Sequence, residues 1–474
     1  MTLVHLQKDP QRSPFQSPWL GLSLLTLAGI TPPALANVGD AFGFGSKSRS
    51  FSGATVSGGA EAFSAYHNPA SIGAFSSARL QFSYGMVFVQ PNFLPIKNVV
   101  IQNRHSGDQT EGNPLYGEID MSYRPTFGQE IGLTYRLFAD RSTLNLGLVS
   151  FIPIQQIAMF DTGERLQPEY VLYRARTQRP QVNLGVGSEI LPGFHLGAGV
   201  GFDFSITSHG EAFITGNAGT SSSMKFSSSV KPKLTPYVGL LYAPQTGSQS
   251  VNWGAVVRLA SATENIMTLK TRARVLGEAA VDLDFNGTSA LYYDPLTLEL
   301  GGSFPITSSS RLYTQLDWQM WNAYQPPALF LEEPTQNHNF FRIMPGKAPD
   351  QSYTNILIPK VGQEIRFTDT TALRLGYAYR PSFLSTPTTG AGNYLDPPKH
   401  VLNLGMGIQS PRFLGLEVPM SLDFHLTYHA LVRQTIVKTA ANESGNAQDP
   451  KIGSPGYDAG GNLWGAGMNL SLAL

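Results

Sequence analysis

Apolar side chains alternate with polar residues or glycine along much of the chain, and this period-two pattern most constrains the fold. Between residues 194 and 206 every even position is apolar, and the odd positions hold His, Gly, Asp or Ser. The same alternation recurs at residues 131–137, 251–259, 312–320, 373–380 and 422–429. It predicts strands whose two faces meet different environments.

None of these apolar faces carries a charge. On a lipid-facing barrel wall a charge near the midplane costs about 2 to 4 kcal/mol, although a soluble sandwich would also alternate. The segments have about the 9 to 11 residues that a tilted spanning strand needs. Their polar faces are rich in Gly, Asn and Arg, and Tyr or Trp recurs near segment ends. We therefore predict an all-β fold, a transmembrane antiparallel β-barrel of about 14 to 16 strands.

Composition excludes several other classes. Only 14% of the residues are charged, and no run reaches the roughly 18 apolar residues of a spanning helix, so helical transporters are excluded. The 33 basic and 33 acidic side chains balance, so no nucleic-acid partner is expected. The chain has no cysteine, and it shows neither a phosphate loop nor a metal-ligand cluster. We expect no cofactor, no metal and no enzyme activity.

Residues 1–36 have the pattern of a cleaved signal peptide. Lys8 and Arg12 precede an uncharged apolar run at 19–30, and Ala34-Leu35-Ala36 supplies a small-x-small cleavage pattern. The alternative, an uncleaved anchor, is disfavoured because the run is too short to span a bilayer. A secreted, strand-rich chain is expected in the bacterial outer membrane.

Residues 37–78 lack strand periodicity and hold glycines spaced among Ser, Ala and Phe. Irregular segments of this length are usually functional or disordered. The phenylalanines and scarce charge argue against disorder. We predict a plug inside the lumen, with residues 79–474 forming the barrel; a periplasmic arm is the alternative.

A short motif in this segment connects the chain to a family. Residues 64–70 (Ser-Ala-Tyr-His-Asn-Pro-Ala), preceded by Gly53-Ala54 and Gly58-Gly59, resemble the N-terminal hatch of the outer-membrane long-chain fatty acid and hydrocarbon transporter family (FadL-like, TodX type). Residues 316–321 and 373–379, followed by Pro381, resemble later strands of that family. The resemblance implies a 14-stranded barrel plugged by its hatch.

The resemblance also implies passive transport of hydrophobic compounds. Solute would be captured at an external groove, pass to an internal pocket, move the hatch and leave sideways into the membrane. Long-chain fatty acids are the leading substrate, and aromatic or alkane hydrocarbons are the alternative. The expected partners are the hydrophobic solute, outer-membrane lipid with lipopolysaccharide, and the barrel assembly machinery; the protein is expected to be a monomer.

Two groups of residues are candidates for the gates. The first is the hatch motif Asn68, Pro69 and Ala70, where the amide could hydrogen-bond the wall and proline fixes the backbone; an ordinary Asn-Pro turn is the alternative. The second lies in the third strand, where alternation breaks. Gly147, Phe151 and Pro153 are candidates for a kink that opens the wall laterally, unless Pro153 simply ends the strand.

Ligand contacts are harder to predict from sequence. The candidates are Phe42, Phe44, Phe63, Phe330, Arg258 and Arg374. Phe330 belongs to an apolar stretch within residues 321–360, the proposed external capture segment. The arginines point to the lumen by parity, where each could instead join an acidic partner such as Asp203, Asp317 or Asp423.

Two other function classes remain open. An outer-membrane lipase is suggested by Ser421, Asp423, His425 and His429 on one strand, but that face points to the lumen rather than to lipid. The two histidines are also roughly 13 Å apart by strand rise, too far to share a metal ion. A general porin or a non-transporting surface barrel is the second class, because fold alone does not specify function.

Overall fold

The computed structural model describes residues 42–75, 78–101, 116–119, 121–137, 144–155, 168–173, 179–215, 223–244, 250–274, 281–324, 329–331, 352–385, 393–438, 452–454 and 456–474. The expected signal peptide, residues 1–36, lies outside these ranges. Among the helices within them, none is long and apolar enough to cross a membrane.

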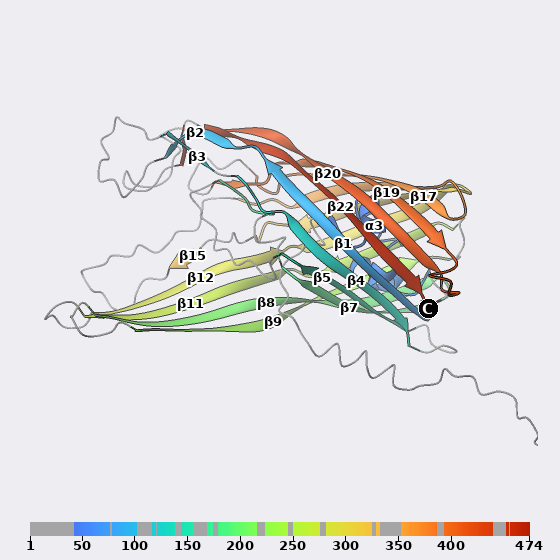
Figure 1. The fold of residues 1–474 in the computed structure, drawn as a ribbon, viewed down its shortest axis with the longest axis horizontal. Helices are drawn as coiled ribbons and strands as arrows, with labels where there is room; N and C mark the ends of the chain where they lie inside the picture. Colours follow the sequence, from blue (N-terminus) through green and yellow to red (C-terminus); the bar gives the residue numbers. More distant parts are fainter. Residues whose placement is uncertain are drawn as a thin grey trace, which may run out of the picture. The chain divides into compact units, whose positions relative to one another are not determined.

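Fourteen strands of the described chain close into an antiparallel barrel, in which each strand pairs with the next (Figure 1). The ring closes between the first and last strands, where Gln81 pairs with Ala473. The wall strands are β1 (Leu80–Phe93), β4 (Thr126–Arg136), β5 (Asn145–Pro153), β7 (Gln181–Leu191), β8 (Phe194–Thr215), β9 (Ser223–Tyr242), β10 (Asn252–Arg258), β13 (Leu296–Thr307), β14 (Ser310–Met320), β16 (Ile356–Arg366), β17 (Thr371–Arg380), β19 (Lys399–Ser410), β20 (Met420–Val437) and β22 (Gly456–Ala473). The predicted fold class is confirmed.

The two faces of the wall follow the sequence alternation. Large apolar side chains stay exposed on the outer face, among them Leu184, Val186, Leu240, Trp253, Leu316, Trp318, Leu375, Leu404, Phe424, Leu426 and Trp464. The alternate positions are buried in the interior, including Glu130, Arg258, Asp317, Arg374 and Asp423. An apolar outer face and a polar interior are what a bilayer requires of a barrel.

The two ends of the barrel differ in their connections. Tight turns at residues 192–193, 308–309 and 367–370 join strands at one end. Long connections join strands at the other end, where residues 321–355 separate β14 from β16. Short turns are periplasmic and long loops extracellular in bacterial barrels, so we call these the periplasmic and extracellular ends.

Further strands lie outside the ring. β11 (Ser261–Arg274), β12 (Val281–Asp294) and β15 (Leu329–Leu331) extend the sheet beyond the wall, since β11 pairs in parallel with β8. β2 (Ile96–Ile101), β3 (Tyr116–Ile119) and β21 (Ile452–Ser454) form a small sheet. β6 (Glu169–Tyr170) pairs with β18 (Tyr394–Leu395).

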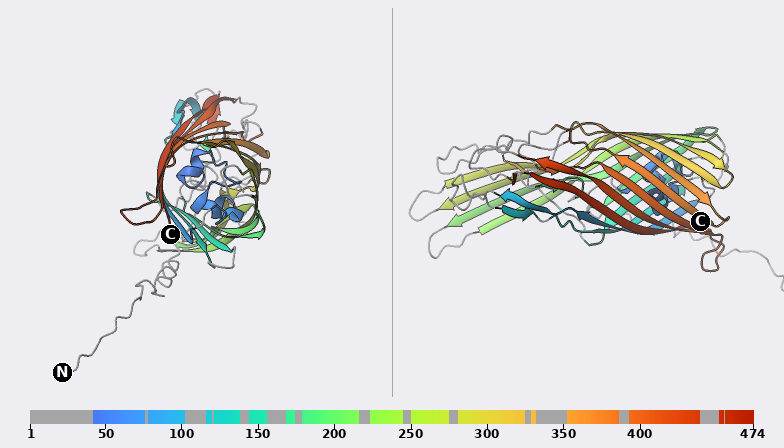
Figure 2. Two further views of the ribbon diagram at one scale, coloured as in Figure 1. Left: turned by 90° about the vertical axis from the view of Figure 1, so that its right-hand side faces the viewer. Right: turned by 90° about the horizontal axis from the view of Figure 1, so that it is seen from above.

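Residues 42–75, which we call the luminal segment, lie inside the barrel (Figure 2). The segment forms short helical turns, α3 (Ser46–Ser50), η1 (Glu61–Phe63), α4 (Ser64–His67) and η2 (Pro69–Ser71). Gly45, Gly53, Gly58 and Gly59 all have positive φ, which glycine adopts without steric cost. The spaced glycines thus allow the compact turns of a segment that has no strand of its own.

Candidate functional site

Asn68 links the luminal segment to the barrel wall. Its Nδ2 donates to the Val56 carbonyl at 2.7 Å and to the Leu240 carbonyl of β9 at 2.9 Å. Its Oδ1 accepts from the Ala70 N–H at 3.0 Å, capping the turn in which Pro69 is the first residue. The side chain is fully buried, so each of these bonds is made out of contact with water.

A buried ion pair fixes the other part of the segment. Arg49 Nη1 donates to Glu130 Oε2 of β4 at 2.9 Å, and both side chains are almost completely buried. The Gly45 N–H donates to the same carboxylate oxygen at 3.1 Å. An Arg–carboxylate pair with two parallel hydrogen bonds gives strong, directional attachment.

Backbone carbonyls of the segment accept hydrogen bonds from the wall. The Tyr237 hydroxyl donates to the Ala65 carbonyl. Arg258 Nη2 donates to the Tyr66 carbonyl at 2.7 Å and lies over the rings of Tyr66 and Tyr237, 4.5 and 4.3 Å from their centroids. The segment is therefore held by polar contacts on several strands.

Wall glycines allow the segment to approach the strands closely. A Cβ at Gly197 would lie 2.2 Å from backbone atoms of Pro69 and Ala70, and one at Gly239 would lie 2.1 Å from Asn68 Oδ1. Equivalent collisions with the segment would occur at Gly132, Gly187, Gly254, Gly376 and Gly405. The glycines that enrich the polar faces of the strands thus form an inner surface that fits the luminal segment.

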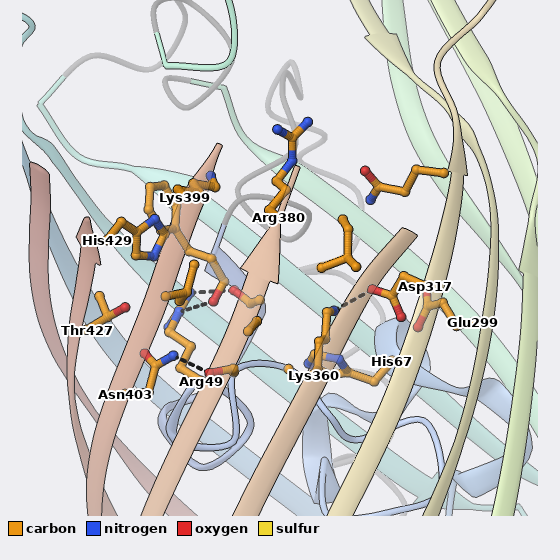
Figure 3. A pocket seen from close by; sticks show the side chains of 18 of the residues that line it. Arg49, His67, Glu299, Asp317, Lys360, Arg380, Lys399, Asn403, Thr427 and His429 are labelled. Atoms are coloured by element: carbon orange, nitrogen blue, oxygen red, sulfur yellow. Dashed lines mark hydrogen bonds and ion pairs between the residues drawn. The ribbon is translucent and has the colours of Figure 1, made fainter. Parts of the chain in front are cut away.

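A chamber lies on the extracellular side of the segment (Figure 3). Its lining comes from the segment and from β13, β14, β16, β17, β19 and β20. The charged side chains in the lining are Arg49, Glu299, Asp317, Lys360, Arg380 and Lys399. Lys360 pairs with Asp317, as the dashed line in Figure 3 marks. The chamber therefore presents more cationic than anionic groups.

Two aromatic clusters adjoin the chamber, at residues that flank the extracellular ends of the strands. The first contains Tyr293, Trp321, Tyr324, Tyr353 and Phe383, with Trp321 stacked on Phe383 at 4.4 Å between centroids. The second contains Phe93, Tyr123, Tyr170 and Tyr173, with Phe93 stacked on Tyr170 at 4.0 Å. The lining of the chamber itself is mostly polar, and the apolar side chains lie in the two clusters beside it.

One chamber cation contacts each cluster. The Arg380 guanidinium lies 5.7 Å from the Trp321 ring centroid and 5.5 Å from that of Phe383, and it pairs with Asp396 at 2.9 Å. Lys399 Nζ lies 4.8 Å from the Tyr173 ring centroid and donates to its hydroxyl. Burial raises the pKa of Tyr173 well above its usual range, so its hydroxyl stays protonated.

His67 lies at the boundary between segment and chamber. Its Nε2 is 3.0 Å from the Phe44 carbonyl, which accepts the hydrogen bond. Burial lowers the pKa of His67 to about 3, and the positive charges of Lys360, Arg258 and Arg49 act in the same direction. The imidazole is therefore neutral at ordinary pH.

The predicted ligand-contact residues have different environments. Phe42 lines the chamber, with its ring 5.3 Å from that of His429. Phe44 and Phe63 are buried in the core around the segment, Phe44 edge-on to Tyr66 at 4.6 Å. The side chain of Phe330 lies outside the described part of the structure, and most of the predicted capture segment does too.

The two predicted arginines have partners within the protein and are not among the residues that line the chamber. Their assignment as ligand contacts stays a prediction. Arg258 is engaged with Tyr66 and Tyr237 as described above. Arg374 Nε donates to Glu364 at 2.9 Å and its Nη1 pairs with Asp423. A buried guanidinium must be paired, and Arg374 is paired with these two acidic side chains in the interior of the barrel.

The third wall strand, β5, has regular pairing with both of its neighbours. It pairs with β4 from Asn145 to Pro153 and with β7 from Asn145 to Phe151, and neither ladder shifts register. Gly147 instead faces Ala65 and Ile72 of the segment, and Phe151 covers Gly128. Pro153 lies just beyond the last pair with β7 and has no N–H to extend that ladder. The alternation of burial is broken at Val149, Ser150 and Phe151, which are all buried. The role of Gly147, Phe151 and Pro153 in lateral opening stays a prediction.

The residues that suggested a lipase all lie in the interior. His425 Nδ1 is 3.0 Å from Ser46 Oγ, and Ser421 Oγ donates to Asp423 at 3.2 Å. His425, His429 and Asp423 are all buried under the luminal segment or among luminal side chains. Within the described residues no cluster of His, Asp and Glu could hold a metal ion.

Sequence reasoning missed the chamber cations and both aromatic clusters. Strand parity placed Arg380 on the inner face, a signal that could have found it. Lys399 and the aromatic residues come from separate connections, and no local pattern joins them.

Comparison with solved structures identifies the architecture. The Pseudomonas putida toluene transporter TodX superposes with a TM-score of 0.51 at 12% identity, covering 91% of this chain and 99% of TodX. A Pseudomonas aeruginosa FadL homologue gives a TM-score of 0.51 at 13% identity, covering 93% and 98%. The chain has the FadL/TodX fold. Since a closed barrel with an apolar outer face is the architecture of bacterial outer-membrane proteins, the FadL/TodX fold places this chain in that membrane.

Sequence comparison gives one shorter match. No family model matches the chain. Alkane uptake protein A of Marinobacter nauticus is 33% identical over 102 residues, which is 21% of this chain and 23% of that relative. The match thus spans about a quarter of the length of that curated relative.

Proposed function

We propose that this chain is a passive outer-membrane channel for hydrophobic compounds. The observation that carries the proposal is a barrel whose lumen is filled by its own N-terminal segment, leaving a chamber beside two aromatic clusters. A water-filled pore offers little to an apolar solute, whereas aromatic side chains bind one by burying its surface. The names of the fold neighbour TodX and of the alkane uptake protein support this class of substrate.

The transport route follows from the position of the segment. Solute enters at the extracellular end, passes the aromatic clusters and reaches the chamber, whose floor is the luminal segment. Passage beyond this point requires the hatch motif Asn68, Pro69 and Ala70 to leave the wall. Lateral release into the membrane completes the route, and it needs no nucleotide, metal or enzymatic step.

Long-chain fatty acids are the first substrate class that we propose. Lys399 in the chamber lining can bind a carboxylate, and Lys360 and Arg380, which already pair with Asp317 and Asp396, lie in the same lining. The aromatic clusters accept the alkyl chain. Aromatic or alkane hydrocarbons are the second class, supported by the names of the similar proteins. We further propose a monomer, inserted by the barrel assembly machinery and surrounded by outer-membrane lipid and lipopolysaccharide.

Uptake by whole cells tests the function. Cells that express the chain should accumulate a labelled long-chain fatty acid or labelled hexadecane faster than cells with an empty vector. The variant Asn68→Ala/Pro69→Ala should change the rate. Equal uptake with and without correctly inserted protein would reject the transport function.

Conductance distinguishes the rival class of a general porin. A porin would form large, stable channels in planar bilayers, whereas a barrel with a filled lumen should conduct little. A non-transporting surface barrel would conduct little and also fail to increase uptake.

A further inference from the structure

One strand of the wall carries an apolar strip that continues beyond the membrane. Every even position of β9 from 224 to 242 is exposed. Ser228 is polar, two positions are proline, and the others are large apolar residues. The members are Met224 (71% exposed), Phe226 (63%), Val230 (47%), Pro232, Leu234 (58%), Pro236, Val238 (52%), Leu240 (42%) and Tyr242 (46%). We call this set the β9 strip.

The strip begins on the lipid-facing wall and continues on the same face of β9 beyond it. The β8–β9 ladder runs from Phe194 opposite Tyr242 to Phe213 opposite Ser223 with no register shift, so the even face stays the same face throughout. β7 pairs with β8 only as far as Phe202, which is opposite Leu234. Above that level β8 and β9 have left the wall.

The length of the projection follows from the register. A tilted spanning strand takes about 9 to 11 residues, which Leu234–Tyr242 provides. Residues 224–233 therefore project beyond the bilayer by up to roughly 33 Å at about 3.3 Å per residue. Figure 1 shows β8, β9, β11 and β12 running on together past the rest of the wall.

A buried polar network braces the base of this projection. Arg179 Nη2 pairs with Asp294 of β12 at 2.9 Å, and its Nη1 lies 3.3 Å from Asp203 of β8. The Ser261 hydroxyl, where β11 begins, donates to Asp203 at 2.7 Å. Three strands meet at these side chains, which hold the start of β11 and the end of β12 against β8.

The edge and width of the strip argue against a protein partner. Pro232 cannot donate to a neighbouring strand, and Lys225, Lys231 and Lys233 lie on the same strand, features that protect an edge from pairing. The strip is one strand wide, because Ile206 and Ser208 beside it on β8 are buried. A stable protein interface buries roughly 800 Å² on each partner, over many more residues. A thin, flexible apolar molecule fits it better.

We propose that the β9 strip is an external track for uncharged alkyl compounds, along which they cross the saccharide layer and reach the outer leaflet without entering the lumen. The proposal rests on the proposed function and assigns alkanes and fatty acids to different routes. An alkane that has reached the leaflet dissolves in the bilayer, because it carries no charge to desolvate. A fatty acid carries a carboxylate and still needs the chamber.

The experiment compares two variants in two hosts. The strip variant, Met224→Ser/Phe226→Ser/Val230→Ser, changes exposed side chains only. Its control, Ser227→Thr/Ser229→Thr/Lys231→Ser, changes the opposite face of the same strand. The hosts carry either full-length lipopolysaccharide or one truncated to its innermost sugars, and the probes are labelled hexadecane and labelled palmitate.

In the host with full-length saccharide, the strip variant should lower the initial rate of hexadecane uptake at least fivefold and palmitate uptake less than twofold. In the truncated host it should change neither rate more than twofold, and the control should match the wild type in both. Unchanged hexadecane uptake in the full-length host overturns the track. So does an equal loss in both hosts, which would indicate a partner protein or a second copy on this face. Wild-type uptake no faster than the empty vector, for both probes, would instead reject the proposed function itself.

Discussion

The amide of Asn68 and the carbonyl of Leu240 lie 2.9 Å apart, and this hydrogen bond joins the luminal segment to the wall of the barrel. A second donor of the same amide satisfies Val56 inside the segment. Asn68 therefore couples the conformation of the segment to its attachment. We expect Asn68→Ala to weaken both, at a cost of about 1 to 3 kcal/mol for each buried carbonyl left unpaired. Single-channel recordings should show more frequent openings than in the wild type, with normal barrel assembly; wild-type gating would contradict this role.

Gly197 tests the close approach of segment and wall. A Cβ at this position would lie 2.2 Å from the backbone of Pro69 and Ala70, so Gly197→Ala should displace the hatch motif. The matched control is Gly201→Ala on the same strand, where the nearest atom lies 3.2 Å from the added Cβ. We expect Gly197→Ala to raise the conductance and the protease sensitivity of the segment, and Gly201→Ala to have a much smaller effect. Equal effects of the two variants would argue against this fit.

His67 predicts a pH dependence of the segment. Its pKa is lowered to about 3 in the docked state from an ordinary value of 6.5, so the displaced segment binds the proton more readily. Docking is fully stabilised above about pH 6.5 and weakens as the pH falls towards 3. Conductance in planar bilayers should therefore rise on acidification from pH 7 to pH 4. His67→Gln, which keeps a donor for the Phe44 carbonyl, should reduce that rise, and an unchanged pH profile in this variant would assign the response to other groups.

Ser150 of β5 and Val182 of β7 are paired directly across the ladder. A disulfide in Ser150→Cys/Val182→Cys would lock this part of the wall. Because both ladders of β5 are intact, we expect uptake to be unchanged by oxidation and by subsequent reduction with dithiothreitol. Loss of uptake that dithiothreitol restores would show that the wall opens here and would support Gly147, Phe151 and Pro153 as the lateral gate.

Arg380 and Lys399 should discriminate between charged and uncharged substrates. Each contacts an aromatic cluster and lines the chamber. Replacing both by Met, together with Asp396→Asn so that no buried carboxylate is left unpaired, keeps the aliphatic bulk and removes the charges that would meet a carboxylate. We expect palmitate uptake to fall about tenfold and hexadecane uptake to change little, measured in the same cells. An equal loss for both substrates would indicate a structural role for the two cations.

Much of the barrel follows from the sequence by itself. Strand alternation is local, with a period of two residues, so Leu426 and Asp423 could be assigned to opposite faces without any knowledge of their neighbours. In the structure Leu426 is 56% exposed and Asp423 is 4% exposed, which agrees with that assignment. The same parity directed Arg374 inward, and the motif at Asn68 drew attention to the segment that fills the lumen.

The tertiary structure decided which inward-facing groups meet. Arg374 binds Glu364, ten residues away, and Asp423 on a more distant strand, and Arg49 binds Glu130 across the lumen. Strand parity gives the side of the wall on which a charge lies but not the register that chooses its partner. The chamber likewise joins Lys399 with Tyr173, which are 226 positions apart.

The projection of β8 and β9 shows the same division most clearly. The sequence alone makes most even positions of both strands apolar, and it predicts that they form the outer face of the wall, where Leu196 is 45% exposed. It does not reveal that the face changes environment higher up, at the level where β11 pairs with β8 and Ile206 is only 7% exposed. Period-two patterning is set by each residue's nearest neighbours along one strand, whereas pairing between distant strands depends on the closure of the whole barrel.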